Sequence, residues 1–383
     1  MRILWHAGGA PWEPTGYGGQ TAIWATVLHD EGHEVAISLN HGLQGDPQGD
    51  WCGMRVYPAA LGHHPSAGPL TIRGNLEDFK PDLVIVLADV WPLNPRIFQG
   101  YRTLAWMATD TDPLGVGDAV FLRTGQVRPV AMSRHGQRIL KEATFAAPYV
   151  PHAIDTGAFL PHEDRDACRA ALGLTPGVFA AGMNVSNTDY VRKAIPEQLA
   201  AFRRFHAKHP ASRLFLHTIE REGNSLDVHQ LVEYGMPELG PLVVKISDQW
   251  RMQTGGFSAE HMRAWYTAMD VVMNVTRGEG FGLPAVEAQA CGTPVILAAN
   301  TTGPELAGPG WTVKCQPWWD TAHASWRGTP LVDDLVRVLG EARAVLSNPG
   351  KAAIKRAACR VFAEQYSIDR IWPLWKKVID DAG

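Results

Sequence analysis

Short runs that are apolar at nearly every position recur along this chain, and segments with helical periodicity separate them. Such runs are typical of parallel strands covered on both faces, because an exposed face would place polar residues at alternate positions. The alternation therefore predicts a doubly wound α/β fold. The expected strands are 2–7, 33–40, 82–90, 101–108 and 128–133 in the first part of the chain, and 178–185, 212–218, 241–247, 270–276 and 294–299 in the second.

Residues 148–166 interrupt the alternation with clustered prolines, charges and a glycine, as a linker does. We therefore expect two Rossmann-like domains, residues 1–153 and 154–364, that face each other across a cleft. Because ligands bind beyond the carboxyl ends of parallel strands, the loops at those ends should line the cleft. The segment 366–381 has the pattern of an amphipathic helix.

Composition excludes several classes of protein. A net charge of −4 gives no broad basic surface for nucleic acid or membrane. The N-terminal residues lack the apolar run of a signal peptide, and the run at 83–88 is too short to span a bilayer. The five cysteines lack CxxC spacing, which argues against a structural zinc site or a disulfide framework. Such cysteines are typical of proteins in the reducing cytoplasm. We expect a cytoplasmic protein without an integral membrane segment; the sequence does not indicate its oligomeric state.

The stretch "GEGFGLPAVEAQACGTPV" (278–295) places a glycine-rich turn between a strand and a helix expected to start at Leu283 or Pro284. Gly280 and Gly282 allow a tight turn and close approach of a ligand. The backbone amides of Gly280, Phe281, Gly282 and Leu283 should then point outward together, reinforced by the helix dipole. The turn is predicted to bind a phosphate or diphosphate.

Two glutamates, Glu279 and Glu287, flank the turn. Carboxylates in contact with the anion would cancel its attraction, so each glutamate should accept hydrogen bonds from neutral hydroxyls. A nucleotide sugar supplies hydroxyls on both sides of its diphosphate. We expect Glu279 to bind the transferred sugar and Glu287 the ribose. The alternative is that both are ordinary surface charges.

This segment closely resembles the Glu-x7-Glu signature of retaining glycosyltransferases of sequence family 4, which have the GT-B fold. "TGYGGQTAIWATVLHDEGHEV", "PHAIDTGAF", "FSAEHMRAWYTAMDVVMNVT" and "TTGPEL" resemble further parts of that family, in the same order. The resemblance implies transfer of a sugar from a nucleotide-diphosphate donor to an acceptor hydroxyl, with retention of configuration and without metal or cofactor. It also implies that a C-terminal helix (365–383) returns to the N-terminal domain, and that Gly18 and Gly19 approach the diphosphate or the acceptor.

The chain departs from the family at two places. The family usually grips the diphosphate with an arginine and a lysine six positions apart; here Lys193 stands at the lysine position and Asn187 at the arginine position, with Arg192 able to supply the missing charge. The family often has a histidine near the transferred sugar, and Asp110 stands nearest to that place. By this resemblance Lys193, Glu279 and Asp110 are the expected catalytic residues, with Lys193 and the turn amides stabilising the leaving diphosphate.

Other interpretations stay open or are disfavoured. Asn187 leaves room for a nucleotide-sugar-binding protein that does not catalyse. A nicotinamide oxidoreductase would need a glycine where Thr21 stands, and an acidic residue after the second strand. The "DTD" at 110–112 matches a metal-binding motif, but three-residue matches arise easily by chance, and Asp112 before Pro113 is typical of a turn. His63 and His64 have no partner at ligand spacing.

The acceptor and the donor base are also open. The acceptor could be a lipid, a glycan, a protein side chain, a small metabolite or a modified nucleobase. Most of the fourteen tryptophans should be core residues, but Trp12 or the Trp318–Trp319 pair could line a sugar-binding cleft. His217 is expected at a strand end, as a structural histidine or a substrate contact.

Overall fold

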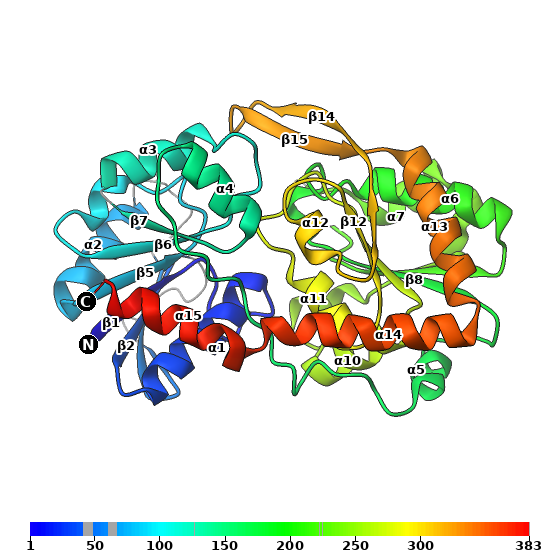
Figure 1. Cartoon of the computed structure of the whole chain (residues 1–383), viewed down its shortest axis with the longest axis horizontal. Coiled ribbons are helices and arrows are strands. Elements are labelled where there is room, and N and C mark those ends of the chain that lie inside the picture. Colours follow the sequence, from blue (N-terminus) through cyan, green and yellow to red (C-terminus); the bar gives the residue numbers. More distant parts are fainter. Residues whose placement is uncertain (41–48, 60–66, 126, 222, 224, 383) are drawn as a thin grey trace. The chain divides into compact units, whose positions relative to one another are not determined.

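The computed structural model describes residues 1–40, 49–59, 67–125, 127–221, 223 and 225–382, so His63 and His64 lie outside the described residues. The chain forms two compact units, each built on its own sheet (Figure 1). Unit 1 comprises Met1–Ala153, Trp319–Trp326 and Ile368–Gly383; unit 2 comprises Ile154–Trp318 and Arg327–Ser367.

The sheet of unit 1 has seven strands in the order β3-β4-β2-β1-β5-β6-β7, and all neighbours are parallel except β3 and β4. The strands are β1 (Arg2–Ala7), β2 (Glu34–Leu39), β3 (Gly49–Trp51), β4 (Met54–Tyr57), β5 (Leu83–Leu87), β6 (Thr103–Met107) and β7 (Arg128–Ala131). The helices are α1 (Gly16–Asp30), α2 (Ala67–Phe79), the 3-10 turn η1 (Pro95–Phe98), α3 (Val116–Gly125), α4 (Arg134–Glu142) and α15 (Ile368–Asp380).

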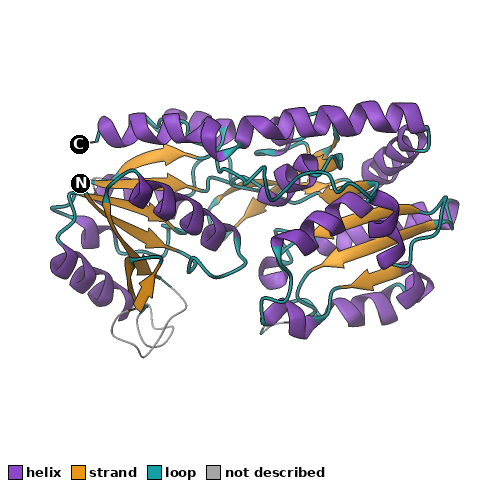
Figure 2. Ribbon diagram, turned by 90° about the horizontal axis from the view of Figure 1, so that it is seen from below, coloured by secondary structure: helices purple, strands orange, loops and turns teal. Residues whose placement is uncertain are grey.

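Helices cover both faces of this sheet (Figure 2). Alternate residues of β1 show why the strand is apolar throughout: Leu4 belongs to a core shared with α2, η1, α3 and α4, whereas Trp5 faces the other way. Trp5, Trp24, Trp106 and Trp375 are fully buried there, with the Trp106 and Trp375 rings 4.9 Å apart. The C-terminal helix α15, which contributes Trp375, is therefore part of the core of unit 1.

The sheet of unit 2 has six parallel strands in the order β10-β9-β8-β11-β12-β13. The strands are β8 (Phe179–Asn184), β9 (Ser212–His217), β10 (Val244–Ile246), β11 (Val271–Asn274), β12 (Val295–Ala298) and β13 (Trp311–Val313). The main helices are α5 (Arg165–Ala171), α6 (Ile195–Lys208), α10 (Ala259–Ala268), α11 (Leu283–Ala290), α13 (Val332–Leu346) and α14 (Pro349–Ala363). Shorter helical segments are η2 (Asn187–Asp189), α7 (Val228–Gln230), η3 (Leu231–Gly235), η4 (Pro237–Leu239), α8 (Gly240–Val243), α9 (Gln249–Gln253), α12 (Gly303–Leu306) and η5 (Glu364–Tyr366).

A hairpin of β14 (Cys315–Asp320) and β15 (Ser325–Pro330) forms a separate two-stranded sheet. Its tip, residues 319–326, belongs to unit 1. Trp326 pairs with Asp112 through two backbone hydrogen bonds of 3.0 and 3.1 Å, and the Ser325 hydroxyl donates to the carbonyl of Pro113. No strand was predicted in this segment.

The predicted α/β fold with two parallel sheets is confirmed, and each of the ten expected runs contains a strand. One boundary was wrong: helical periodicity in the sequence predicts the first helix over 21–32, after a glycine-rich loop. The first helix begins at Gly16, so Gly18 and Gly19 lie in its first turn and not in a loop before it. The Thr15 side chain caps this helix by accepting from the amide of Gly18, which allows a glycine-rich stretch to start helical.

Candidate functional site

The glycine-rich turn connects β11 to α11, which begins at Leu283 as expected. Gly282 has φ of +113°, a conformation that side-chain-bearing residues rarely adopt, and no side chain caps the helix. Within the described part of the chain, the amides of Gly280, Gly282 and Leu283 donate to no protein acceptor. A helix start with unused donors is a site for water or for an anionic ligand.

The turn is held from behind by the segment that follows β12. The Thr301 hydroxyl accepts from the amide of Glu279 at 3.1 Å, and the Thr302 hydroxyl donates to the carbonyl of Phe281 at 2.7 Å. The Phe281 side chain is buried, with its ring 5.5 Å from that of Tyr366. Phe281 therefore anchors the turn through its side chain and can meet a ligand only through its backbone.

Glu279 forms an ion-paired cluster with the segment that follows β8. The Lys193 ammonium lies 2.6 Å from Oε1 of Glu279, and the Arg192 guanidinium lies 3.4 Å from Oε2. Burial acts to raise the pKa of Glu279, but the two cations outweigh it, so the pKa is lowered and the carboxyl stays ionised. Glu279 was predicted to have only neutral partners; in the structure it pairs with two cations.

Arg192 and Asn187 differ in where their side chains lie. Arg192 donates to the carbonyl of Gly278 at 3.1 Å and pairs with Asp189 at 2.9 Å, so it lies beside the turn. The Asn187 side chain is buried, and its amide donates to backbone carbonyls of Ile219, Glu220 and Leu226 at 2.6–3.2 Å. Asn187 thus fixes a neighbouring loop, and its side chain is turned away from the glycine turn.

Glu287 lies on α11 and is half-buried. Its carboxylate accepts a 2.7 Å hydrogen bond from the hydroxyl of Tyr266 on α10, which in turn accepts from the amide of Asn184 at the end of β8. Burial raises the pKa of Glu287 to about 7, although the Tyr266 hydrogen bond acts to lower it. Glu287 is therefore the carboxyl near the turn that changes charge close to neutral pH. Sequence reasoning missed Tyr266 and Asn184, for which no motif gave a signal.

The remaining expected residues lie in unit 1. The amides of Gly18 and Gly19 are bound internally, to the side chain and the carbonyl of Thr15. A Cβ at Gly18 would come within 2.4 Å of a backbone oxygen, whereas one at Gly19 would meet nothing within 4 Å. Asp110 follows β6, at the carboxyl end of that strand. The structure brings Lys193, Arg192 and Glu279 together in unit 2 and places Gly18, Gly19 and Asp110 in the other unit.

His217 is a structural histidine. It is buried at the end of β9, its Nδ1 lies 3.0 Å from the Ser247 hydroxyl, and its ring packs edge-on against Phe257. Burial lowers its pKa to about 4, so the ring is neutral.

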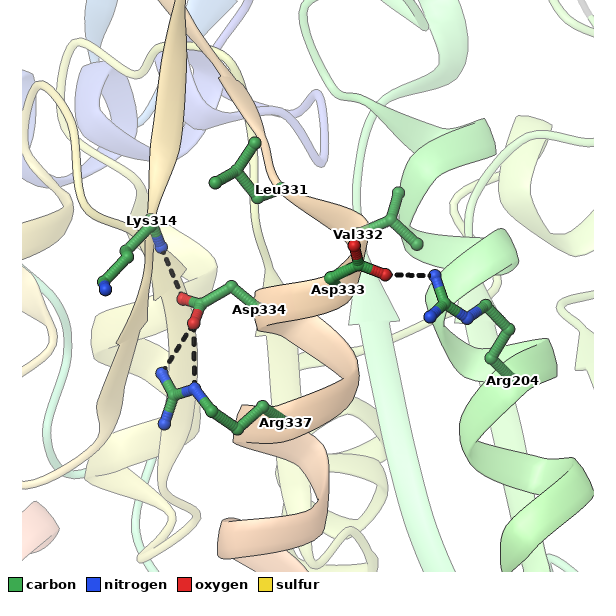
Figure 3. A pocket seen from close by; sticks show the side chains of 7 residues that line it. All are labelled: Arg204, Lys314, Leu331, Val332, Asp333, Asp334 and Arg337. Atoms are coloured by element: carbon green, nitrogen blue, oxygen red, sulfur yellow. Dashed lines mark hydrogen bonds and ion pairs between the residues drawn. The ribbon is translucent and has the colours of Figure 1, made fainter.

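A cavity of about 530 Å³ lies elsewhere on unit 2 (Figure 3). Two ion pairs lie in its lining: Asp333 with Arg204 at 2.6 Å, and Asp334 with Arg337 at 2.8 Å. The residues that line it are Arg204, Lys314, Leu331, Val332, Asp333, Asp334 and Arg337. Nothing in this lining points to a particular ligand.

A search for metal ligands found no group of three or more His, Cys, Asp or Glu side chains that could hold an ion among the residues described. Of the helices in the described ranges, none is both long and apolar enough to cross a membrane.

Known proteins match this chain both in sequence and in structure, and the sequence matches cover only part of it. The family model "Glycosyl transferases group 1" matches residues 178–318. D-inositol 3-phosphate glycosyltransferase 1 of Catenulispora acidiphila is 31% identical over 206 residues, 51% of this chain and 44% of the relative. The D-inositol 3-phosphate glycosyltransferase of Geodermatophilus obscurus is 34% identical over 153 residues, 39% of this chain and 32% of the relative. The matches thus span less than half the length of these curated relatives.

Solved structures match along the whole chain. Sucrose-phosphate synthase of Thermosynechococcus elongatus has a TM-score of 0.76 at 17% identity, covering 99% of this chain and 98% of that one. HepE of Anabaena in complex with UDP-glucose has a TM-score of 0.71 at 15% identity, covering 99% and 100%. These likenesses establish the GT-B fold. Together with the sequence matches, they confirm the resemblance to glycosyltransferases of the family-4 type.

Proposed function

We propose that this protein is a glycosyltransferase that moves a sugar from a nucleoside-diphosphate donor to an acceptor hydroxyl, with retention of configuration and without a metal. The observation that carries the proposal is the uncapped start of α11. Its free amides lie beside two cations, Lys193 and Arg192, and beside Glu287, whose pKa is about 7. The family match supports it, because residues 178–318 include all of these groups.

In this proposal the diphosphate binds at the turn. The amides of Gly280, Gly282 and Leu283 donate to its oxygens, and the dipole of α11 adds to the attraction. Lys193 and Arg192 lie beside the turn, and their positive charge acts mainly as the sugar–phosphate bond breaks. Arg192 takes the place of the family's arginine, because the Asn187 amide is occupied by three backbone carbonyls.

The two glutamates then bind the ends of the donor. Glu287 accepts the ribose hydroxyls with the carboxylate oxygen that Tyr266 leaves free. Glu279 accepts a hydroxyl of the transferred sugar while it keeps its contact with Lys193. Asp110 remains our proposed contact on the sugar side, and Gly18 and Gly19 remain proposed points of approach for donor or acceptor.

The chemistry needs no side-chain base. The bond between the anomeric carbon and the phosphate oxygen breaks, and the acceptor oxygen bonds to that carbon on the same face. The acceptor's proton passes to the departing phosphate oxygen. Negative charge grows on the diphosphate, where Lys193 and the turn amides stabilise it; fixed groups of this kind are typically worth about 3–4 kcal/mol each. The five free cysteines suit the cytoplasm, which we propose as the compartment.

The experiment begins with a thermal-shift panel of UDP, GDP, ADP and NAD on the wild-type protein. The sugar conjugates of the nucleotide that binds are then assayed for release of nucleoside diphosphate. Lys193→Ala should lower turnover at least 100-fold, as expected from about 3 kcal/mol of lost transition-state stabilisation. Lys314→Ala, a lysine of the same unit outside the turn, is the matched control.

Each alternative has its own outcome. A loss under tenfold would remove Lys193 from the proposed role. Binding of a nucleotide sugar with no release of nucleoside diphosphate would favour a binding protein without catalysis. A thermal shift by NAD alone would overturn the transferase proposal.

A further inference from the structure

Three tryptophans of unit 1 are exposed side by side. Trp91, Trp319 and Trp326, here called the tryptophan platform, have relative exposures of 53%, 43% and 47%. The rings of Trp319 and Trp326 lie 5.0 Å apart. The ring of Trp91 lies 5.6 Å from that of His323, which stands in the hairpin turn between Trp319 and Trp326. Exposed large apolar side chains gathered in one place usually mark a binding surface.

The surrounding backbone holds the platform in place. Trp326 is paired with Asp112, and the carbonyl of His323 accepts from the amide of Val116 at 3.2 Å. Gly117 on α3 lets Trp91 pack closely, because a Cβ there would come within 2.8 Å of it. The hairpin tip is therefore fixed to the loop after β6 and the start of α3, which sets where the tryptophan side chains start from the backbone.

The platform lies at the carboxyl edge of the unit 1 sheet, the edge at which ligands bind in folds of this class. Trp91 follows β5, and the loop that carries Asp112 follows β6. Another exposed tryptophan, Trp12, follows the neighbouring strand β1. Within unit 1 this edge is thus aromatic, whereas Trp5, Trp24, Trp106 and Trp375 are buried in the core.

The loops that carry or contact these tryptophans hold charges of one sign only. The segments 8–15, 88–94, 108–118 and 319–326 contain six carboxylates and neither lysine nor arginine; the six are Glu13, Asp89, Asp110, Asp112, Asp118 and Asp320. Arg138 of α4 pairs with Asp112, but it also pairs with Glu142. A ligand bearing phosphate, sulfate or carboxylate would be repelled, and a surface that docks on anionic lipid would carry lysine and arginine around its tryptophans.

We propose that the tryptophan platform binds the acceptor, and that the acceptor is a saccharide without anionic groups. The apolar C–H face of a pyranose ring stacks on the electron-rich face of an indole, and the sugar hydroxyls donate to carboxylates at the rim. This inference rests on the proposed function, because it names the substrate class for the acceptor side of the same reaction.

The test uses the full chain on an array of neutral gluco-, galacto- and manno-oligosaccharides, with phosphorylated, sulfated and uronic-acid sugars on the same array. The strongest ligand is then titrated by calorimetry. Trp326→Ala and Trp91→Ala should each weaken its binding at least tenfold. Trp250→Ala removes a more exposed tryptophan, 73% exposed, from unit 2 and should leave the binding unchanged. Thermal shift with the nucleoside diphosphate is measured on every variant.

Selective binding of neutral oligosaccharides that both platform variants weaken would support the proposal. It would be overturned by preference for the anionic sugars, by absence of saccharide binding, or by saccharide binding that both variants leave intact. Platform-dependent binding to vesicles of anionic lipid, or platform-dependent dimerisation, would also overturn it. Failure here with an intact nucleotide shift refutes only the acceptor inference, whereas loss of the wild-type nucleotide shift refutes the proposed function itself.

Discussion

Replacing Glu287 by glutamine should make unit 2 more stable at pH 8 and weaken its binding of a nucleoside diphosphate. Burial raises the pKa of Glu287 from 4.5 to about 7. Because the folded-state pKa is the higher one, the wild-type protein has its full stability below about pH 4.5 and loses stability as the pH rises through 7. Glutamine carries no charge at any pH and avoids that loss.

The size of the effect follows from the shift in pKa. A shift from 4.5 to about 7 corresponds to at most roughly 3 kcal/mol at about 1.4 kcal/mol per unit. For a unit of this size, 1 kcal/mol moves the melting temperature by about 2–4 °C, so Glu287→Gln should melt about 6–12 °C higher than wild type at pH 8. The two proteins should melt alike near pH 4.5, where the wild-type carboxyl is neutral in the folded state.

The assay is urea and thermal unfolding of both proteins at pH 4.5, 6 and 8, with the transition of unit 2 followed separately. Glu279→Gln is a control for which the opposite change in stability at pH 8 is expected. Burial favours a higher pKa for Glu279, but Lys193 and Arg192 outweigh it and lower the pKa. The ion pairs of Glu279 therefore contribute stability at pH 8 that is lost as the pH falls through its lowered pKa, and Glu279→Gln should be less stable than wild type at pH 8.

Equal or lower stability of Glu287→Gln at pH 8 would show that Glu287 is not buried as a strained carboxylate, and would refute the reasoning. Nucleotide binding by Glu287→Gln then measures the functional effect of the same substitution. A carboxylate accepts stronger hydrogen bonds than an amide, so the glutamine variant should bind more weakly even though it folds more stably. A residue retained at a cost in stability is expected at a functional site.

Three further changes test the local structure. Gly282→Ala should lose nucleotide binding and about 1–3 kcal/mol of stability in urea unfolding, because its φ of +113° strains any side chain. Gly340→Ala is the control: a Cβ at this position of α13 meets no atom within 4 Å, so the variant should be neutral or slightly stabilised. Asn187→Ala should cost about 1–3 kcal/mol in urea unfolding, because three partly buried carbonyls lose the Asn187 amide as a donor. Asp270→Asn should cost about 3–5 kcal/mol by the same measurement, because three arginines surround this carboxylate.

The fold could be predicted because its cause lies in local pattern. A parallel strand covered on both faces must be apolar at each position. The sequence "LVIVL" therefore predicts β5, in which all five residues are buried. The start of α11 was equally readable, since a glycine followed by Leu283 and Pro284 specifies a helix start. The start of α1 was misjudged because glycines were weighed above the capping residue Thr15.

The contacts of the site were harder to predict because they join segments far apart in sequence. Asn187 occupies the position of a family arginine, yet its amide is used by carbonyls more than thirty residues further on. The Glu287–Tyr266 hydrogen bond joins two helices that no motif pairs. The hairpin tip departs from the pattern most: its residues follow a strand of unit 2 but pack against the loop after β6 in unit 1.

The ion-paired cluster beside the turn suggests how the site divides binding from catalysis. Lys193 is 2.6 Å from Glu279, and Arg192 is shared between Glu279 and Asp189, so both cations are already compensated. A diphosphate that arrives in the ground state gains little from a lysine whose charge is neutralised, and depends mainly on the free amides of the turn. As the sugar–phosphate bond breaks, charge grows on the diphosphate and draws Lys193 away from Glu279. An interaction that strengthens only then raises the rate more than the affinity. On this reasoning, loss of Lys193 should reduce kcat far more than it raises KM.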